Sequence, residues 1–195
     1  MKEEITLPQP KLVSQVSIEQ AISQRRSIRK FNPQQLSLES LSQLLWSAQG
    51  ITDSGRSLRA APSAGALYPM EIYALNQDGV FRYLPQAHKL KQVIAEDLRQ
   101  QLSQAAWGQG FVASAPLDIV IAAVYERITS QYGQRGKFYT DIEVGHIAQN
   151  VHLQAVALGL GSVPVGAFDP QEVKKLLKLP EPEIPLYIIP VGYPK

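Results

Sequence analysis

Apolar residues follow helical spacing in three segments of the chain, and each segment is preceded by a residue type that caps helices. Ser17 precedes the first, and Gln20 three residues later completes a capping box, so a helix begins here. Ser37 precedes the second, in which leucines recur at helical spacing until Gly50. Asp169, followed by a proline, precedes the third. The pattern therefore predicts three capped, amphipathic helices.

Other apolar runs have the length and residue types of strands. Glu71–Leu75 and Val80–Tyr83 flank an Asn-Gln-Asp-Gly sequence, which is typical of a hairpin. Leu117–Tyr125 is apolar throughout and predicts a strand buried on both faces. Leu186–Val191 predicts a further strand, whereas Val93–Gln104 suits a helix. Because strands and helices mix without strict alternation, the predicted fold class is α+β.

Two segments depart from these ordinary patterns. Phe138–Leu158 is predicted to be a long helix that is apolar nearly all round, which is typical of a core or a large interface. Ile51–Leu67 is predicted to be a long loop rich in small and polar residues. Loops of this length are usually functional or disordered, and the strong elements on either side favour function.

Composition limits the classes of protein to which the chain can belong. The chain has 195 residues, 45% of them hydrophobic, and we expect an N-terminal arm over 1–16 and one domain over 17–195. It has no cysteine, which excludes thiolate chemistry, and its histidines show no metal-ligand spacing, so no metal site is predicted. The net charge is only +2, and neither a signal peptide nor a membrane-spanning run is present. We therefore expect a cytoplasmic protein without nucleic-acid or membrane partners.

A basic cluster follows the first predicted helix. Arg25, Arg26, Arg29 and Lys30 surround Ser27 where the chain becomes extended. A solvated basic face near a helix end accounts for this pattern. A phosphate site is a second interpretation, which the Ser27 hydroxyl favours, because guanidinium groups beside a hydroxyl suit phosphate oxygens. A nucleic-acid patch is a third interpretation, although the nearly neutral chain has no second basic run.

Two further segments carry small residues that leave their backbone amides accessible. One is Ser63–Ala66, which lies between Pro62 and Pro69, and the other is Val163–Phe168. Small residues permit close approach of a flat ligand to the backbone, or they simply turn the chain.

Taken in order, several short strings resemble the nitroreductase family of flavin oxidoreductases and, within it, the SagB-type dehydrogenase branch. The resemblance extends from about Ser17 to Gly192. The strings are RRSIRKF at 25–31, PSAGALYP at 62–69, YGQRG at 132–136, GHIAQN at 145–150, ALGLG at 157–161, VPVGAF at 163–168 and PVG at 190–192. Their order and spacing make the match strong.

The resemblance implies a nitroreductase-like fold with a central mixed or antiparallel sheet flanked by helices, in an intertwined homodimer that binds FMN at its interface. On this resemblance, Arg25 and Ser27 hold the FMN phosphate and Arg26 contacts the ribityl chain. Arg29 contacts the N1/O2 edge of the ring, where a cation suits the negative charge of the reduced flavin.

The resemblance also implies contacts to the flavin ring from other segments. The loop residues that cover the ring from the partner subunit are Pro62, Ser63 and Ala64. The backbone amides of Gly166 and Ala167 face the N5/O4 edge, and Gln109 contacts the pyrimidine end.

This chain departs from typical nitroreductases in the same loop. Where typical members have Pro-Ser-Ser-x-Asn-x-Gln-Pro, it has Ala64, Ala66 and Tyr68 at the second Ser, the Asn and the Gln. Fewer polar side chains around the ring favour the SagB-type branch. Many relatives also contact the phosphate from a C-terminal extension, for which this chain offers only Lys195.

A second departure concerns proton transfer. SagB-type enzymes that oxidise azoline rings carry a Lys-Tyr pair, and here the pair is Gln131-Tyr132. Glutamine has no titratable proton and cannot act as a general base. Tyr132 remains as the candidate catalytic residue, a proton donor beside the flavin, or else it packs at the mouth of the pocket.

The function predicted from these features is FMN-dependent two-electron transfer between NAD(P)H and a small acceptor such as a quinone or nitroaromatic. Azoline dehydrogenation is one alternative, and an FMN carrier or regulatory protein without turnover is another. A basic module for nucleic acid or phosphoprotein is a third, and it would be colourless.

Overall fold

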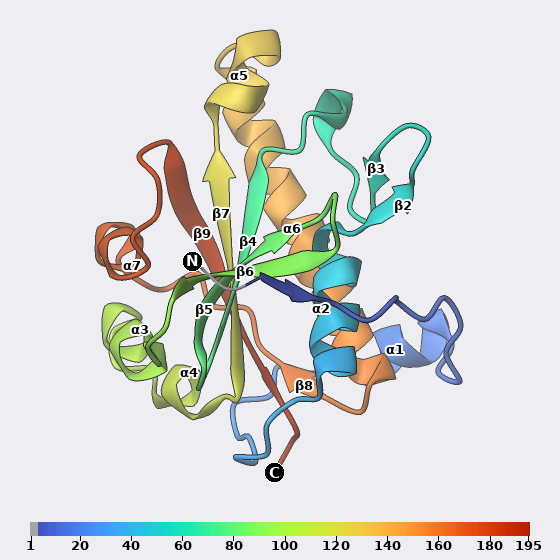
Figure 1. Ribbon diagram of the computed structural model, residues 1–195, viewed down its shortest axis with the longest axis vertical. Coiled ribbons are helices and arrows are strands. Elements are labelled where there is room, and N and C mark those ends of the chain that lie inside the picture. Colours follow the sequence, from blue (N-terminus) through green and yellow to red (C-terminus); the bar gives the residue numbers. More distant parts are fainter. Residues whose placement is uncertain (1–3) are drawn as a thin grey trace.

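The computed structural model describes residues 4–195, and its central feature is a seven-stranded sheet (Figure 1). The strand order is β1-β6-β5-β4-β7-β9-β8, and every neighbouring pair is antiparallel. The strands of this sheet are β1 (Glu4–Thr6), β4 (Met70–Asn76), β5 (Gly79–Leu84), β6 (Lys89–Ile94), β7 (Leu117–Val124), β8 (Gly161–Ser162) and β9 (Glu183–Gly192). A separate two-stranded sheet pairs β2 (Ile51–Asp53) with β3 (Leu58–Arg59).

Helices cover both faces of the large sheet (Figure 1). They are α1 (Ile18–Gln24), α2 (Leu38–Gln49), α3 (Arg99–Ala105), α4 (Gly110–Ser114), α5 (Glu126–Tyr132), α6 (Arg135–Ala157) and α7 (Pro170–Leu176), with a short 3-10 turn, η1, at Ala64–Ala66. Helices α2 and α6 pack on one face, and α3 and α7 on the other. Within the part of the chain that the structure describes, no helix is both long and apolar enough to cross a membrane.

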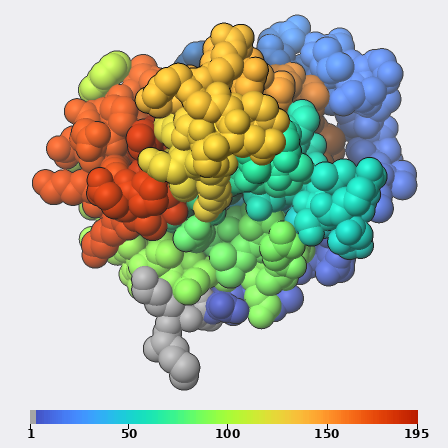
Figure 2. All heavy atoms as spheres, turned by 90° about the horizontal axis from the view of Figure 1, so that it is seen from above, coloured from blue at the N-terminus to red at the C-terminus, as the bar shows by residue number. Residues whose placement is uncertain are grey.

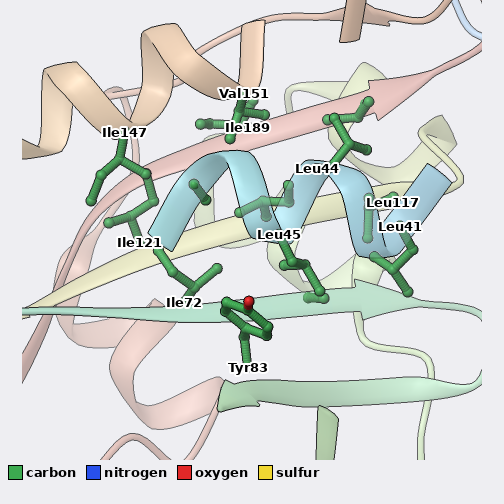
Figure 3. Close-up of a cluster of buried hydrophobic side chains, with 14 of the residues drawn as sticks. Leu41, Leu44, Leu45, Ile72, Tyr83, Leu117, Ile121, Ile147, Val151 and Ile189 are labelled. Atoms are coloured by element: carbon green, nitrogen blue, oxygen red, sulfur yellow. The ribbon is translucent and has the colours of Figure 1, made fainter. Parts of the chain in front are cut away.

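Strand β7 shows why the sequence contains one unbroken apolar run. Ile119 and Ile121 face the α2–α6 side, and Val120 and Ala122 face the α3–α7 side. Both faces are therefore buried, as predicted. On the first side, leucines of α2 pack against isoleucines of the sheet and of α6 (Figure 3). Each such fully buried side chain contributes about 1.5–3 kcal/mol relative to exposure.

The local sequence signals correctly predicted the starts of three helices. Ser17 caps α1 with its capping box to Gln20, and Ser37 caps α2, which ends at Gly50. Asp169 caps α7. The predicted hairpin is present as β4–β5, and the predicted α+β class with an antiparallel sheet is confirmed.

The prediction of a helix over Val93–Gln104 is wrong in its first part. Val93 and Ile94 end strand β6, where Ile94 pairs with Val80 of β5. Helix α3 begins only at Arg99. Val93 and Ile94 are both β-branched, and the pairing of their strand with β5 outweighs the helical spacing of the sequence.

Two segments that were expected to be irregular contain strands. The predicted loop over Ile51–Leu67 includes the small β2–β3 sheet and the turn η1. Within 1–16, Glu4–Thr6 forms the edge strand β1 and Leu7 is buried. The division of the chain into an arm and one domain stays a prediction.

Candidate functional site

The basic cluster lies against the segment that follows α6. Ser27 forms a parallel bridge with Ser162, and the Ile28 N–H donates to the Ser162 carbonyl at 3.0 Å. A Cβ atom at Gly161 would lie 2.7 Å from the Cβ of Ile28, so only glycine permits this approach. The structure thus brings Arg25–Arg29 beside the small-residue segment Val163–Phe168, from the other end of the chain.

His152 of α6 contacts Ser162 at this junction. Its side chain is buried, and its Nδ1 lies 2.7 Å from the Ser162 hydroxyl oxygen. Burial, and to a smaller extent the positive charge of Arg25, lower the pKa of His152 to about 4. His152 is therefore neutral at neutral pH, so the positive charge here comes from the arginines.

Gln109 and Arg29 join the second half of the same site. The Gln109 amide donates to the carbonyls of Ala106 at 2.9 Å and Ala167 at 2.8 Å. The Arg29 guanidinium lies 5.8 Å from the centre of the Phe111 ring in α4. The extended segment after α1, the start of α4 and the segment after β8 therefore meet at one end of the sheet (Figure 1).

The donors of this cluster are largely free. The Arg26 guanidinium donates to the backbone carbonyls of Ser23 and Arg25. No other residue of the described 4–195 range forms a hydrogen bond or ion pair with the guanidinium groups of Arg25 and Arg29. A group of cations without an acidic partner is suited to an anionic ligand such as a phosphate.

The loop Pro62–Pro69 lies elsewhere, against α5 and the first half of α6. It lines a pocket of about 250 Å³, whose lining residues are Pro62, Ser63, Ala64, Tyr139, Ile142, Glu143 and His146. Gly65 has φ of 61°, and a Cβ atom there would lie 2.9 Å from the Tyr132 hydroxyl. In the view from above, the teal region of the chain that includes this loop lies beside the yellow and orange α5 and α6 (Figure 2). The structure thus places Tyr132 against this loop.

The structure does not bring this loop to the basic cluster within one chain. The loop packs near Glu143, whereas the cluster packs near His152. These two positions are about 13 Å apart along the α6 axis, given the rise of an α-helix. Within one chain, the loop and the basic cluster therefore pack against different segments of α6.

A comparison with protein families identifies the chain. The family model described as "Nitroreductase family" matches residues 22–193. The protein belongs to the nitroreductase family. It is an oxidoreductase of that family with the family's fold.

Individual relatives agree with this assignment. A provisionally named nitroreductase of Methanocaldococcus jannaschii is 43% identical over 97% of this chain and 96% of its own length. The crystal structure of a provisionally named nitroreductase from Ralstonia eutropha has a TM-score of 0.90 at 32% identity, over 98% of this chain and 90% of that chain. More distantly, the FMN reductase [NAD(P)H] of Bacillus subtilis is 29% identical over 51% of this chain and 45% of its own length. The assignment to the SagB-type branch stays a prediction.

Sequence reasoning missed two charged residues of this chain. Glu143 is 2% exposed, and one of its oxygens, Oε2, has no hydrogen-bond partner in the described residues. Burial raises its pKa to about 7, although the Ser63 hydroxyl, the Gln49 amide and Arg59 favour the charged form. The second is Arg59, whose Nε is also without a partner among those residues. The available signal was spacing, because Glu143 stands four residues before the buried Ile147.

Proposed function

We propose that the protein is an FMN-dependent oxidoreductase that passes two electrons from NAD(P)H to a small organic acceptor such as a quinone or a nitroaromatic. The observation that carries this proposal is the backbone contact of Ser27 and Ile28 with Ser162. It holds Arg25 and Arg29, whose guanidinium groups have no acidic partner in the described residues, near the segment that follows β8. The relative named FMN reductase supports the choice of cofactor.

The residues present fit FMN in three respects. Arg25 and the Ser27 hydroxyl would bind the phosphate, and Arg26 has further N–H groups for the ribityl chain. Gly166 and Ala167 are exposed, and neither amide donates to another backbone carbonyl in the described residues, so both can face the N5/O4 edge. FMN bound here would supply two-electron redox chemistry at N5.

Two more residues would orient the ring. Arg29 would place its charge at the N1/O2 edge, where it favours the reduced, anionic ring. The side-chain Nε2 of Gln109 donates to the carbonyls of Ala106 and Ala167. The side-chain Oε1 of Gln109 would then accept from the N3–H of the pyrimidine end.

We also propose a homodimer, because the loop and the basic cluster pack against different segments of α6 within one chain. In a two-fold assembly, Pro62, Ser63 and Ala64 of the partner copy would cover the ring bound by the first copy. Exposed apolar side chains mark the surface that this assembly would bury. They are Ile18 and Ile22 on α1 and Phe138 and Ile142 on α6, each at least 43% exposed.

Replacing one of these apolar residues should separate the dimer. We expect Ile142→Asp to shift the protein from dimer to monomer in light scattering at micromolar concentration, and to reduce the flavin that co-purifies. Trp107→Asp is the matched control, because Trp107 is 71% exposed at the α3–α4 corner, away from this surface. A wild-type monomer that still carries flavin would overturn the proposed dimer.

The chemistry at Tyr132 distinguishes the proposed reductase from an azoline dehydrogenase. The Tyr132 hydroxyl lies beside Gly65 of the covering loop, and its ring packs edge-on against Tyr139 with centroids 5.4 Å apart. From this position it could donate a proton to a bound acceptor, whereas its neighbour Gln131 cannot remove one. Reduction of an acceptor by the flavin needs a proton donor at this position, whereas it needs no general base.

We therefore expect NAD(P)H to bleach the flavin and quinones or nitroaromatics to be reduced slowly, with little azoline oxidation. Assays of the wild type and of Gln131→Lys, each with an azoline peptide and a quinone, test this. Efficient peptide oxidation by the wild type would contradict the proposal, as would quinone turnover no faster than that of free FMN. A yellow protein that NADH and NADPH both fail to bleach would indicate a carrier.

A further inference from the structure

We propose that Tyr68 is a positioning residue that holds the Pro62–Pro69 loop, before any cofactor binds, in the shape in which it covers the flavin ring. This inference rests on the proposed function for what the loop covers. The shape of the loop in the apoprotein does not depend on that function, and limited proteolysis without FMN measures it.

Every polar group of Tyr68 is engaged within the protein. Its N–H donates to the Ser63 hydroxyl oxygen at 2.9 Å, and its carbonyl accepts from Arg127 Nη1 at 3.1 Å. Its hydroxyl oxygen accepts from the backbone N–H of Arg59 at 3.0 Å. The Arg59 guanidinium also lies 4.6 Å from the centre of its ring. One side chain and its backbone thus connect both ends of the loop, β3 and α5.

The loop needs such support because its backbone is strained. Ala66 has φ of 53° and Tyr68 has φ of 48°, in the left-handed region that residues with a side chain seldom adopt. Residues in this region persist only where surrounding contacts over-determine them. The four contacts of Tyr68 supply that constraint at the point where the strain occurs.

The contacts of Tyr68 are anchored in rigid elements. Arg127, which holds the Tyr68 carbonyl, pairs at 2.5 Å with Glu71 of β4. Arg59, which holds the ring and the hydroxyl, donates to Gln49 of α2 at 3.2 Å, and Gln49 is fully buried. The loop is therefore tied to the central sheet on one side and to the α2 end on the other.

The composition of the loop explains why its shape matters here. Ala64 and Ala66 offer no polar side-chain groups to a ring, so recognition depends on where the backbone lies. The Ser63 hydroxyl oxygen accepts from the Tyr68 N–H, so the side chain of Ser63 is also fixed in position. A preformed loop binds without paying the entropy of ordering, which raises affinity.

The experiment compares Tyr68→Ala, Tyr68→Phe and a control, Tyr193→Phe, whose hydroxyl makes no hydrogen bond in the described residues. Trypsin sites at Arg56 and Arg59 immediately precede the loop, and Arg59 is held by Tyr68, so cutting there reports the order of this region in the apoprotein. Fluorescence titration gives FMN affinity, and the melting temperature reports global stability.

We expect Tyr68→Ala to be cut at Arg59 at least tenfold faster than the wild type and to bind FMN at least tenfold more weakly. Tyr68→Phe keeps the ring but loses one hydrogen bond, so its changes should be a few-fold, and Tyr193→Phe should match the wild type. Equal cutting rates in all four proteins would overturn the inference. If Tyr68→Ala does not fold, Tyr68→Phe decides by the same two measurements. A wild type that resists trypsin but binds no FMN would contradict only the proposed function.

Discussion

Arg25→Ala should weaken FMN binding about ten- to a hundredfold. A hydrogen bond from a charged donor is worth about 1.5–3 kcal/mol, and every 1.4 kcal/mol is a factor of about ten in affinity. Arg25 ends α1 beside Ser27, and the bridge to Ser162 fixes that position without using the Arg25 guanidinium. The substitution should therefore remove a ligand contact and leave the fold intact. Fluorescence titration of the apoprotein with FMN measures the change.

Arg56→Ala is the matched control, because it removes the same charge from an exposed ion pair with Asp53. The control should bind FMN as the wild type does. Raising the salt concentration should weaken FMN binding to the wild type more than to Arg25→Ala, because one charge of the proposed phosphate site is missing in the variant. If Arg25→Ala binds FMN as tightly as the wild type, the cluster is only a solvated basic face.

The parts of the fold that sequence could predict are those decided within a few residues. Ser17, Ser37 and Asp169 act as caps through bonds to amides two or three residues ahead, so the signal and the structure are equally local. Strand β6 was missed because its pairing with β5, such as that of Ile94 with Val80, is a contact that only the assembled sheet creates. Tertiary pairing then overrides the local pattern.

The candidate site divides in the same way. The resemblance pointed to Arg25 and Gly166, but not to the contact between Ile28 and Gly161 that brings their segments together. The separation of the Pro62–Pro69 loop from the basic cluster also depends on the fold, because each packs against a different segment of α6. Glu143 was hidden for a further reason. Its chemistry depends on burial, and burial here is supplied by neighbouring elements.

Glu143 makes stability depend on pH in a direction that can be tested. Burial raises its pKa in the folded protein to about 7, from the ordinary value of 4.5. Below pH 4.5 the carboxyl is neutral in both folded and unfolded chains and carries no cost. Between pH 4.5 and 7 the unfolded chain has released the proton while the folded one retains it, so stability falls as pH rises. Above pH 7 the full cost is present, about 3 kcal/mol for a difference of this size.

Glu143→Gln should therefore stabilise the protein at pH 8 by up to about 3 kcal/mol more than it does at pH 4.5. The amide keeps an oxygen to accept from Gln49 but cannot ionise. Urea unfolding at the two pH values and one protein concentration measures this, with the exposed Glu96→Gln as the control that should show no such change. A pH-independent difference would mean that the carboxylate is paired when charged. The Nε of Arg59 lacks a partner in the described residues and carries the nearby positive charge, so it is the group that would form that pair.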